Sequence, residues 1–435
     1  MKFYSTKDLQ HQTTLKEAVL SGMAPSGGLY MPQYIPRLSV KTLSALSLMS
    51  FQEIALAISR NFLGRDLPPK DLEAIVLDAM DLTVKIKELD ESTAVLETWH
   101  GPTMAFKDFG ARFMARLMGY FIRGSDRKLT ILVATSGDTG SAVASGFFQV
   151  PGIEVVILYP SGKVSPSQEQ QLTTQGYNIR ALEVAGTFDD CQRLVKDAFA
   201  DNSLRAEHLL SSANSINIAR LLPQSFYYAF AAGQLEKRAG KLTVSVPCGN
   251  FGNLTAGQFA KRMGVPIDHF VAATNQNDVF PRYLETGKFQ PRRSAQSLSN
   301  AMDVGNPSNL DRIQTLFEHD LESMRSSISS WSFDDAKTVE MIRDTYERYG
   351  YIIDPHTSVG FLGLRAYAKT QEQPLNGLVI STAHPAKFPE SVEPAIGKRI
   401  EIPEQLAQYL NRKKQATPMG NEYGEFRQYL LDSLG

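Results

Sequence analysis

The sequence predicts an α/β protein with more than one domain. Its 435 residues exceed the length at which one hydrophobic core usually stops growing, and 43% of them are hydrophobic. From about residue 130 onward, short runs rich in β-branched residues are each followed by a turn of small residues and an amphipathic segment; these runs are LTILVA, VVILYP and LTVSVP. Such repeated strand, loop and helix units imply a mainly parallel sheet covered by helices on both faces.

The regions on either side of these units have patterns of their own. Residues up to about Val95 predict an α+β region, with a short strand at Lys2 to Tyr4 and then helices separated by the loops APSGGLYMP and GRDLPPKD. Residues 300–345 are polar and mostly helical in pattern, and the sheet pattern returns with NGLVISTAHP. After about Glu401 we expect a peripheral helical tail.

Composition favours small-molecule chemistry. The 45 basic and 46 acidic residues nearly cancel, so neither a nucleic acid nor an anionic membrane is expected as a partner. Cys191 and Cys248 are too few for a disulfide framework and lack the spacing of a zinc site, which fits a reducing compartment. The polar start and the lack of a bilayer-spanning apolar run predict a cytoplasmic protein. No metal site is expected, because the metalloprotease pattern HExxH is absent. The serine-hydrolase pattern GxSxG and the P-loop pattern are absent as well.

Ligands of parallel sheets collect where strands end and helices begin, so the loops TSGDTG, SGKVSP and CGNFGN are the places to expect a site. The segment PCGNFGN, Pro247 to Asn253, lies between LTVSV and a helix expected near Leu254. Its two glycines allow a ligand close to the backbone, and the N–H groups of the following helix favour an anion, particularly a phosphate. The alternative is a strand-to-helix turn without a ligand.

The loop TSGDTG, Thr135 to Gly140, has the same placement. Gly137 and Gly140 remove side chains where a flat ring could approach. Three polar residues could bond to the substituents of such a ring: Ser136, Asp138 and Thr139. Composition alone favours helix capping instead, because Ser, Thr and Asp at a helix start accept hydrogen bonds from unpaired N–H groups.

Lys107 lies in HGPTMAFKDFG, beside Phe106 and Phe109. Apolar surroundings can lower the pKa of a lysine, which an imine-forming amine needs at neutral pH. The alternative is a lysine whose stem packs on aromatic rings while its ammonium reaches solvent. The neighbouring Asp108 suits a surface or capping carboxylate as well as a catalytic one.

Five segments taken in order resemble the signature segments of threonine synthases of the class with an N-terminal extension: HGPTMAFKDFG, ATSGDTGSAV, SVPCGNFGN, DPHTSVG and STAHPAKF. The similarity runs from MKFYSTKD to about Ile396. It implies a fold-type-II pyridoxal-phosphate enzyme, similar to the tryptophan synthase β chain, with the cofactor between two α/β domains. The implied domains are an N-terminal extension at 1–95, a region with the Schiff-base lysine and small domain at 96–240, and a large cofactor-binding domain with the helical tail at 241–435.

The resemblance also implies roles for individual residues. Lys107 matches the lysine that forms the Schiff base with the cofactor. The cofactor phosphate cradle matches Gly249, Asn250, Phe251, Gly252 and Asn253. Thr382 matches the hydroxyl residue at the pyridine nitrogen, where a neutral group does not hold a proton on the ring. Asp138 stands where many wider relatives have an asparagine facing the 3'-oxygen of the cofactor.

By resemblance, the reaction is the last step of threonine biosynthesis. O-phospho-L-homoserine and water give L-threonine and phosphate through γ-elimination and β-addition, and the freed Lys107 moves protons at the α and β carbons. Our candidates for holding the substrate phosphate are Lys163, Ser165, Arg112 and Asn214, each of which also suits an ordinary structural role. No role is assigned to His100, His356 or His384. We expect a monomer or a homodimer.

Two other functions stay open on the sequence alone. One is another enzyme of the same fold type, a hydroxy-amino-acid dehydratase or a cysteine synthase, although such relatives usually lack HGPTMAFKDFG and the long N-terminal extension. The other is a non-catalytic relative that binds the cofactor or a phosphorylated ligand, since fold does not fix activity.

Overall fold

The computed structural model describes residues 1–135 and 137–434, and Ser136 therefore lies outside the described residues. The chain forms two compact units, each assembled from separate stretches of sequence. The first unit contains Met1, 31–101 and 221–401, and the second contains 2–30, 102–220 and 402–435. The domains implied by the resemblance follow a different division, by role rather than by compactness: 1–95, 96–240 and 241–435. They stay a prediction.

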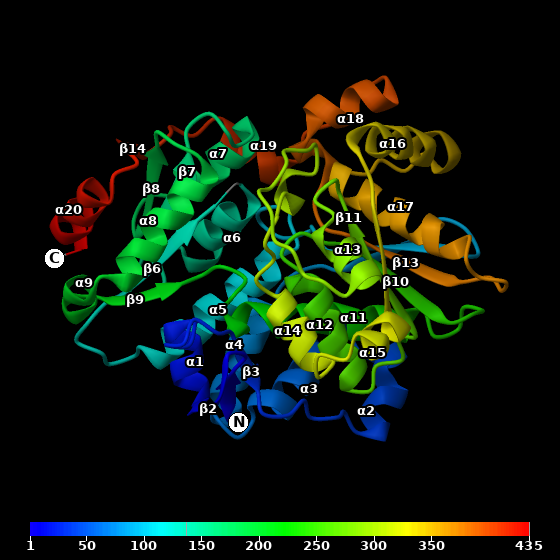
Figure 1. Ribbon diagram of the computed structural model, residues 1–435, viewed down its shortest axis with the longest axis horizontal. Helices are drawn as coiled ribbons and strands as arrows, with labels where there is room; N and C mark the ends of the chain where they lie inside the picture. Colours follow the sequence, from blue (N-terminus) through cyan, green and yellow to red (C-terminus); the bar gives the residue numbers. More distant parts are fainter. Residues whose placement is uncertain (136, 435) are drawn as a thin grey trace. The chain divides into compact units, whose positions relative to one another are not determined.

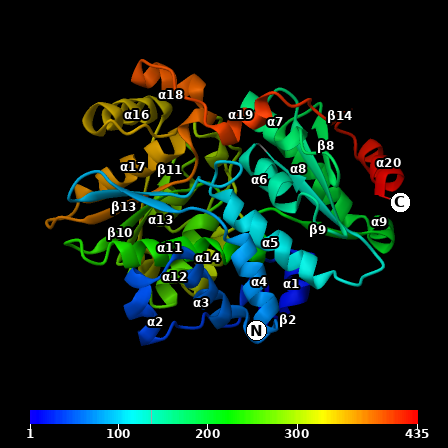
Figure 2. The ribbon, with the colours of Figure 1, turned by 180° about the vertical axis from the view of Figure 1, so that it is seen from behind.

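The first unit is built on a six-stranded sheet. In spatial order its strands are β12 (Ile328–Ser332), β11 (His269–Thr274), β10 (Leu242–Pro247), β13 (Asn376–Ser381), β5 (Thr93–Glu97) and β4 (Lys85–Glu88). All neighbours are parallel except β4, which runs antiparallel to β5. Every residue of β10 and β13 is buried, as expected for central parallel strands covered on both faces. Helix α17 (Pro355–Ala368) packs along β10, β11 and β13 (Figures 1 and 2).

Helices surround this sheet. Helix α3 packs on α4 and α11, α11 packs on α12, and α16 packs on α17 and α18. The helical elements are α2 (Val40–Ala45), η1 (Leu46–Leu48), α3 (Phe51–Leu63), α4 (Pro69–Ala79), α11 (Gln224–Gln234), α12 (Gly252–Arg262), α13 (Val279–Thr286), η2 (Asn300–Met302), α14 (Leu310–Leu316), α15 (Leu321–Ser327), α16 (Asp335–Tyr349), η3 (Pro385–Lys387) and α18 (Pro389–Ile396).

The second unit is built on a five-stranded parallel sheet. Its spatial order is β14 (Ala416–Met419), β8 (Ile179–Val184), β7 (Ile153–Pro160), β6 (Leu129–Ala134) and β9 (Leu209–Ser212). Leu132, Val156 and Leu182 pack in one cluster with α8 (Phe188–Ala200) and α20 (Tyr423–Leu434). Because side chains alternate along a strand, the odd-numbered residues face the other side, where α6 (Asp138–Phe147) packs on β7.

The remaining elements of the second unit are short or lie at its N-terminal part. Strand β1 (Phe3–Ser5) begins one residue after the expected start at Lys2 and pairs antiparallel with β2 (Asp8–Thr13). Strand β3 (Tyr30–Pro32) spans the boundary at which the chain passes from the second unit into the first. The other helices are α1 (Leu15–Ser21), α5 (Lys107–Phe121), α7 (Pro166–Thr173), α9 (Asn202–Glu207), α10 (Ile218–Leu221) and α19 (Glu404–Leu410). Within the described residues, no helix is both long enough and apolar enough to span a bilayer.

Two segments contain a strand that the sequence did not predict. The segment 300–345 is mostly helical, as expected, but it also contains β12 at the edge of the six-stranded sheet. The segment after Glu401 contains the expected helices, but it also contains β14, which pairs in parallel with β8. Both are edge strands, which bond to one neighbour only and therefore show little of the apolar pattern that marks a central strand.

Candidate active site

The helix that follows β10 has no side-chain cap. Its N-cap residue, Phe251, has a left-handed backbone (φ 60°) and its side chain accepts no hydrogen bond. Within the described residues, no acceptor meets the backbone N–H groups of Gly252, Asn253 and Leu254, and the ladder starts with Thr255 N–H bonding to Phe251 O at 3.0 Å. Unpaired N–H groups and the positive end of the helix dipole favour an anion at this end of α12.

Asn253 adds an unpaired side-chain donor to the same helix start. The residue is only 6% exposed, and its Oδ1 accepts hydrogen bonds from the hydroxyls of Tyr227 at 2.6 Å and Tyr228 at 2.7 Å. Its Nδ2 is buried without a partner. A buried amide donor without an acceptor is costly, so this set of donors fits the phosphate of the cofactor that the resemblance implies.

Gly249 is needed for close packing within the chain, and not only for the approach of a ligand. A Cβ atom at this position would lie 2.7 Å from Met302 Cα and 2.9 Å from Ala301 O. The Ala301 N–H donates to His356 Nε2 at 3.2 Å, which holds the segment in place. The side chain of Asn250 is also engaged, since its Oδ1 accepts from Ser308 N–H at 2.6 Å.

Lys107 is the first residue of α5, and its side chain is 14% exposed. Its Nζ lies 3.8 Å from Asp138 Oδ2 and 5.7 Å from the centre of the Phe106 ring. Met104, three residues earlier, has a left-handed backbone (φ 56°), which is rare outside functional or tightly packed sites. The structure thus places the amine in mostly buried surroundings beside a carboxylate, and not on a solvated surface.

Asp138 and Asp108 are both buried, but they have different neighbours. Asp138 Oδ1 accepts from Gln168 Nε2 at 3.0 Å, while its other oxygen faces Lys107. Asp108 accepts from Thr103 N–H at 2.9 Å and from the Thr103 hydroxyl at 2.7 Å, so it closes the turn before α5. Burial lowers the pKa of the nearby Arg220 to about 10, and the Asp108 carboxylate opposes that shift. Asp108 therefore has a structural role.

The loop TSGDTG caps its own helix. Thr135 Oγ1 accepts from Gly137 N–H at 3.0 Å and from Gly140 N–H at 2.9 Å. A Cβ at Gly137 would lie 2.5 Å from the Gln168 side chain, and one at Gly140 would lie 2.5 Å from Thr135 Cγ2. The capping alternative is thus present at Thr135, and both glycines are needed for packing within the unit.

The four candidates for the substrate phosphate all belong to the second unit. Ser165 caps α7, because its hydroxyl accepts from Gln168 N–H at 3.3 Å in a capping box. Lys163 is exposed, and its side chain makes no hydrogen bond or ion pair to a described residue. Asn214 follows β9, and its buried Oδ1 has no partner within the described residues. Arg112 is half-buried on α5.

Thr382 is buried in the loop after β13. The preceding residue, Ser381, bonds through its Oγ to Trp99 Nε1 at 2.9 Å and to Thr357 Oγ1 at 2.9 Å. His384 Nδ1 accepts from Ala386 N–H at 3.1 Å and so caps η3. Burial, with a smaller contribution from His100, lowers the pKa of His384 to about 4, so this ring is neutral at neutral pH.

The other two histidines of the matched segments have structural partners. His100 Nε2 lies 2.7 Å from Glu97 Oε2, and His356 Nδ1 lies 2.7 Å from Asp354 Oδ2. Sequence reasoning missed Asp354, although it stands in the quoted segment DPHTSVG. It also missed Tyr227 and Tyr228, because QSFYYAF resembles an ordinary apolar helix and carries no signal for their hydroxyls.

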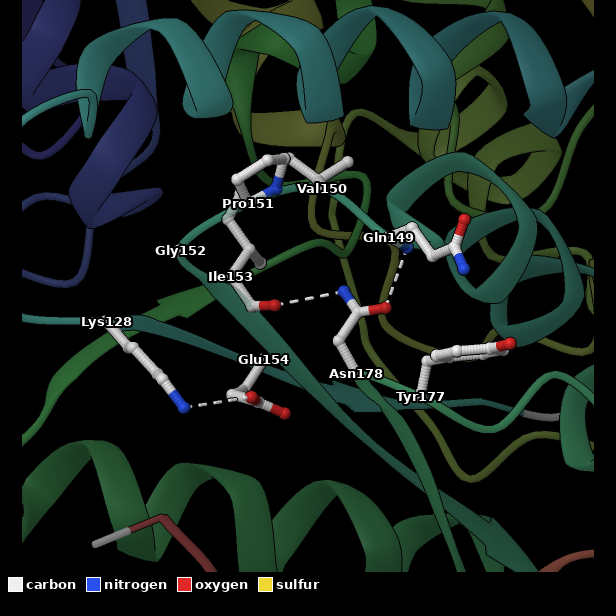
Figure 3. Close-up of a pocket in the computed structure, with 9 residues that line it drawn as sticks. All are labelled: Lys128, Gln149, Val150, Pro151, Gly152, Ile153, Glu154, Tyr177 and Asn178. Carbon is white, nitrogen blue, oxygen red and sulfur yellow. Dashed lines mark hydrogen bonds and ion pairs between the residues drawn. The ribbon is translucent and has the colours of Figure 1, made fainter.

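A surface pocket of about 360 Å³ in the second unit lies apart from these loops. Figure 3 shows its lining, where Lys128 reaches Glu154 and Asn178 bonds to Gln149 and Ile153. These residues lie at the amino ends of β6 and β7, whereas TSGDTG and SGKVSP follow their carboxyl ends. The pocket is therefore at the opposite edge of the sheet and is not part of the candidate site.

Three family models match the chain. The pyridoxal-phosphate dependent enzyme model matches residues 85–382, the threonine synthase N terminus matches residues 2–80, and the threonine synthase C-terminal model matches residues 357–430. The chain is 42% identical to the threonine synthase of Haemophilus influenzae, and the alignment covers 100% of both chains.

Solved structures agree with these matches. The pyridoxal-phosphate-bound threonine synthase of Brucella melitensis is 35% identical and covers 100% of this chain and 99% of its own, with a TM-score of 0.94. The threonine synthase of Escherichia coli is 39% identical and covers 99% and 100% of the two chains, with a TM-score of 0.92. A fungal L-serine ammonia-lyase at 12% identity and a TM-score of 0.55 shares the fold alone.

Proposed function

The chain belongs to the threonine synthase family of pyridoxal-phosphate-dependent lyases, and we propose that it converts O-phospho-L-homoserine and water into L-threonine and phosphate. The observation that supports this proposal most directly is the set of unpaired donors at the start of α12. Three backbone N–H groups and Asn253 Nδ2 lack acceptors there within the described residues, and the cofactor phosphate is an anion of the right kind to accept from them.

Lys107 is our candidate for the lysine that carries the cofactor. When bound, pyridoxal phosphate supplies an electron sink for carbanions that form beside the amino group of the substrate. With cofactor and substrate bound, Lys107 Nζ would take protons from the substrate and return them as a general base and acid. The Asp138 carboxylate at 3.8 Å from Nζ can orient this amine and hold its proton.

Thr382 and the cradle residues have binding roles in this proposal. The hydroxyl of Thr382 would serve the ring nitrogen of the cofactor without charging it, which would temper the electron sink. The loop that contains Gly249, Asn250, Phe251, Gly252 and Asn253 would hold the phosphate. Asp138 would be the partner of the 3'-oxygen of the cofactor.

Lys163 is the better candidate for the phosphate of the substrate. It makes no ion pair with a described residue, and a dianion needs donors of its own beyond those of the cofactor cradle. Ser165, Arg112 and Asn214 are further candidates. Ser165 Oγ caps α7 and lies 3.2 Å from Ser167 Oγ, where either hydroxyl can donate, and the buried unpaired atom of Asn214 is its acceptor Oδ1.

One experiment tests the lysine and the substrate together. Release of phosphate and formation of threonine are measured from O-phospho-L-homoserine for the natural protein, Lys107→Ala and Lys163→Ala. We expect Lys107→Ala to lose at least about 10³-fold in rate and to lose the borohydride-trapped link to the cofactor. Lys163→Ala should raise KM and keep the link.

The alternatives predict other results from the same assay. A dehydratase would release ammonia from threonine or serine and no phosphate. A non-catalytic relative would bind the cofactor at Lys107 and form no threonine under saturating substrate. Either result would contradict the proposed function.

A further inference from the structure

Two consecutive tyrosines of α11 share one partner on α12. Tyr227 and Tyr228 are fully buried, and their hydroxyls lie 2.6 Å and 2.7 Å from the same atom, Asn253 Oδ1. Neighbouring residues of a helix point about 100° apart, so their side chains rarely meet at one place. Here the two rings lie with centroids 5.1 Å apart and converge on one amide.

This convergence fixes the orientation of the Asn253 amide. The Tyr228 hydroxyl also lies 3.2 Å from the backbone carbonyl of Asn253, which can only accept a hydrogen bond. The side-chain atom beside both hydroxyls is Oδ1, which accepts a hydrogen bond from each of them. Because that oxygen faces the two tyrosines, Nδ2 lies on the arm of the planar amide that faces away from them.

Burial favours the protonated, hydrogen-bond-donating form of both tyrosines. It raises the pKa of Tyr227 well above its usual value, and the same cause raises the pKa of Tyr228. The two O–H donors fill both lone pairs of Oδ1, and rotation of the amide would break both of these hydrogen bonds.

Within the described residues, the nitrogen that this arrangement presents has no acceptor. Asn253 Nδ2 is buried and unpaired, and it belongs to the second residue of a helix whose first N–H groups are also unpaired within the described residues. A side-chain donor and backbone donors at one helix start together suit an anion with several acceptor oxygens.

We propose that Tyr227 and Tyr228 are positioning residues that hold the Asn253 amide so that Nδ2 donates to the phosphate of pyridoxal phosphate. This proposal rests on the proposed function, because it takes the anion at α12 to be the cofactor phosphate. The tyrosines act through Asn253 and need no contact with the cofactor themselves.

The test compares pyridoxal phosphate with pyridoxal, which has the same aldehyde and lacks the phosphate. Dissociation constants for both are measured on the apoprotein of the natural chain, Tyr227→Phe, Tyr228→Phe and the double variant. We expect a loss of about threefold for pyridoxal phosphate with each single variant and about tenfold or more with the double variant. Affinity for pyridoxal should stay unchanged.

Asn253 provides the reference for these losses. Asn253→Ala should weaken pyridoxal phosphate binding at least as much as the double tyrosine variant, because it removes the same donor. Asn253→Asp should weaken it more, because a carboxylate repels the phosphate. The ³¹P resonance of the bound cofactor should shift in all of these variants relative to the natural chain.

A matched control separates positioning from stability. Tyr349→Phe removes a tyrosine hydroxyl that donates to Asp90 in the same unit and leaves the Asn253 amide untouched. We expect it to leave the affinities for both ligands and the ³¹P resonance unchanged. Thermal unfolding of every apoprotein shows whether a variant is folded at the assay temperature.

Two results would overturn the proposal while the proposed function stands. One is equal loss of affinity for pyridoxal and pyridoxal phosphate in the tyrosine variants, which would indicate a purely structural role. The other is an unchanged affinity for pyridoxal phosphate in the double variant while Asn253→Ala lowers it. Failure of the natural protein to form a borohydride-trapped link at Lys107 would instead contradict the proposed function.

Discussion

The helices α6 and α12 both begin at the end of a buried parallel strand, but they differ in whether a side chain accepts hydrogen bonds from the N–H groups at the helix start. At α6, Thr135 Oγ1 accepts hydrogen bonds from the N–H groups of Gly137 and Gly140. At α12, no side chain caps the helix, and the first N–H groups have no acceptor within the described residues. Each loop contains two glycines, so glycine content does not distinguish a loop that is closed by its own chain from one that is open to an anion.

Two further strand-end loops resemble the α6 case. Ser165 caps α7 with its hydroxyl, and His384 caps η3 with its ring nitrogen. Three motif-bearing loops, TSGDTG, SGKVSP and STAHPAKF, each supply a side-chain acceptor to an N–H group at the helix start that follows, whereas CGNFGN supplies none within the described residues. The position of a capping side chain is the better guide to a phosphate site than the presence of glycine.

The largest effect is expected for Gly249→Ala, which changes the loop CGNFGN before α12. A Cβ there would lie 2.7 Å from the backbone of Met302, so the backbone must move, and we expect about 2–3 kcal/mol of lost stability together with weaker cofactor binding. Urea unfolding and cofactor titration measure the two effects. Gly424→Ala is the control, because nothing lies within 4 Å of a Cβ at that helical position and stability should stay equal or rise.

The next largest effect is expected in the loop TSGDTG, which Thr135 caps. Thr135→Ala removes the acceptor of two N–H groups at α6, and we expect a loss of about 1–2 kcal/mol in the free energy of unfolding. Thr135→Ser keeps the hydroxyl and should recover most of that loss. Since the cap is internal, the ratio of affinities for pyridoxal phosphate and pyridoxal should not change. A change as large as that of Asn253→Ala would show that the two helix starts do not differ in function.

The smallest effect concerns His384, which caps η3 and is the capping residue whose ring gains a proton in acid. The folded pKa of His384 is about 4, below its ordinary value of 6.5, so the unfolded chain binds the proton more tightly. Stability from this group is fully present above pH 6.5 and is lost as the pH falls toward 4. His384→Asn keeps a capping oxygen that does not titrate. We expect this variant to lose less stability than the natural chain in unfolding measured across that range, and equal losses would contradict the assignment.

Much of the fold could be predicted from local pattern. The runs LTILVA, VVILYP and LTVSVP form β6, β7 and β10, because central parallel strands are continuous apolar segments. The helix expected near Leu254 starts two residues earlier, at Gly252. The edge strands β12 and β14 were missed, since ISSWS and ATPM lack an apolar run and depend on one neighbour for their hydrogen bonds.

The candidate site was predictable only where its residues stand together in one short segment of the sequence. The expectation of an anion at CGNFGN came from glycines before a helix, a signal that TSGDTG shares, and the uncapped start of α12 agrees with that expectation. The amide network of Asn253 was not predictable, because its partners Tyr227 and Tyr228 lie on a different helix and meet it only in the folded chain. The roles of Lys107 and Thr382 depended on resemblance, since a lysine or threonine by itself has many uses.

The unit that carries Lys107 is assembled from three separate stretches of sequence, 2–30, 102–220 and the segment that begins at Ile402. Its sheet receives its last strand, β14, from residues 416–419, long after the chain has left that unit at Arg220. During synthesis the ribosome must therefore deliver nearly the whole polypeptide before this sheet can be completed, and the nascent lysine-bearing unit meanwhile exposes the edge of β8. A chain that stops between Glu401 and Ala416 would therefore lack β14, one of the strands of this sheet.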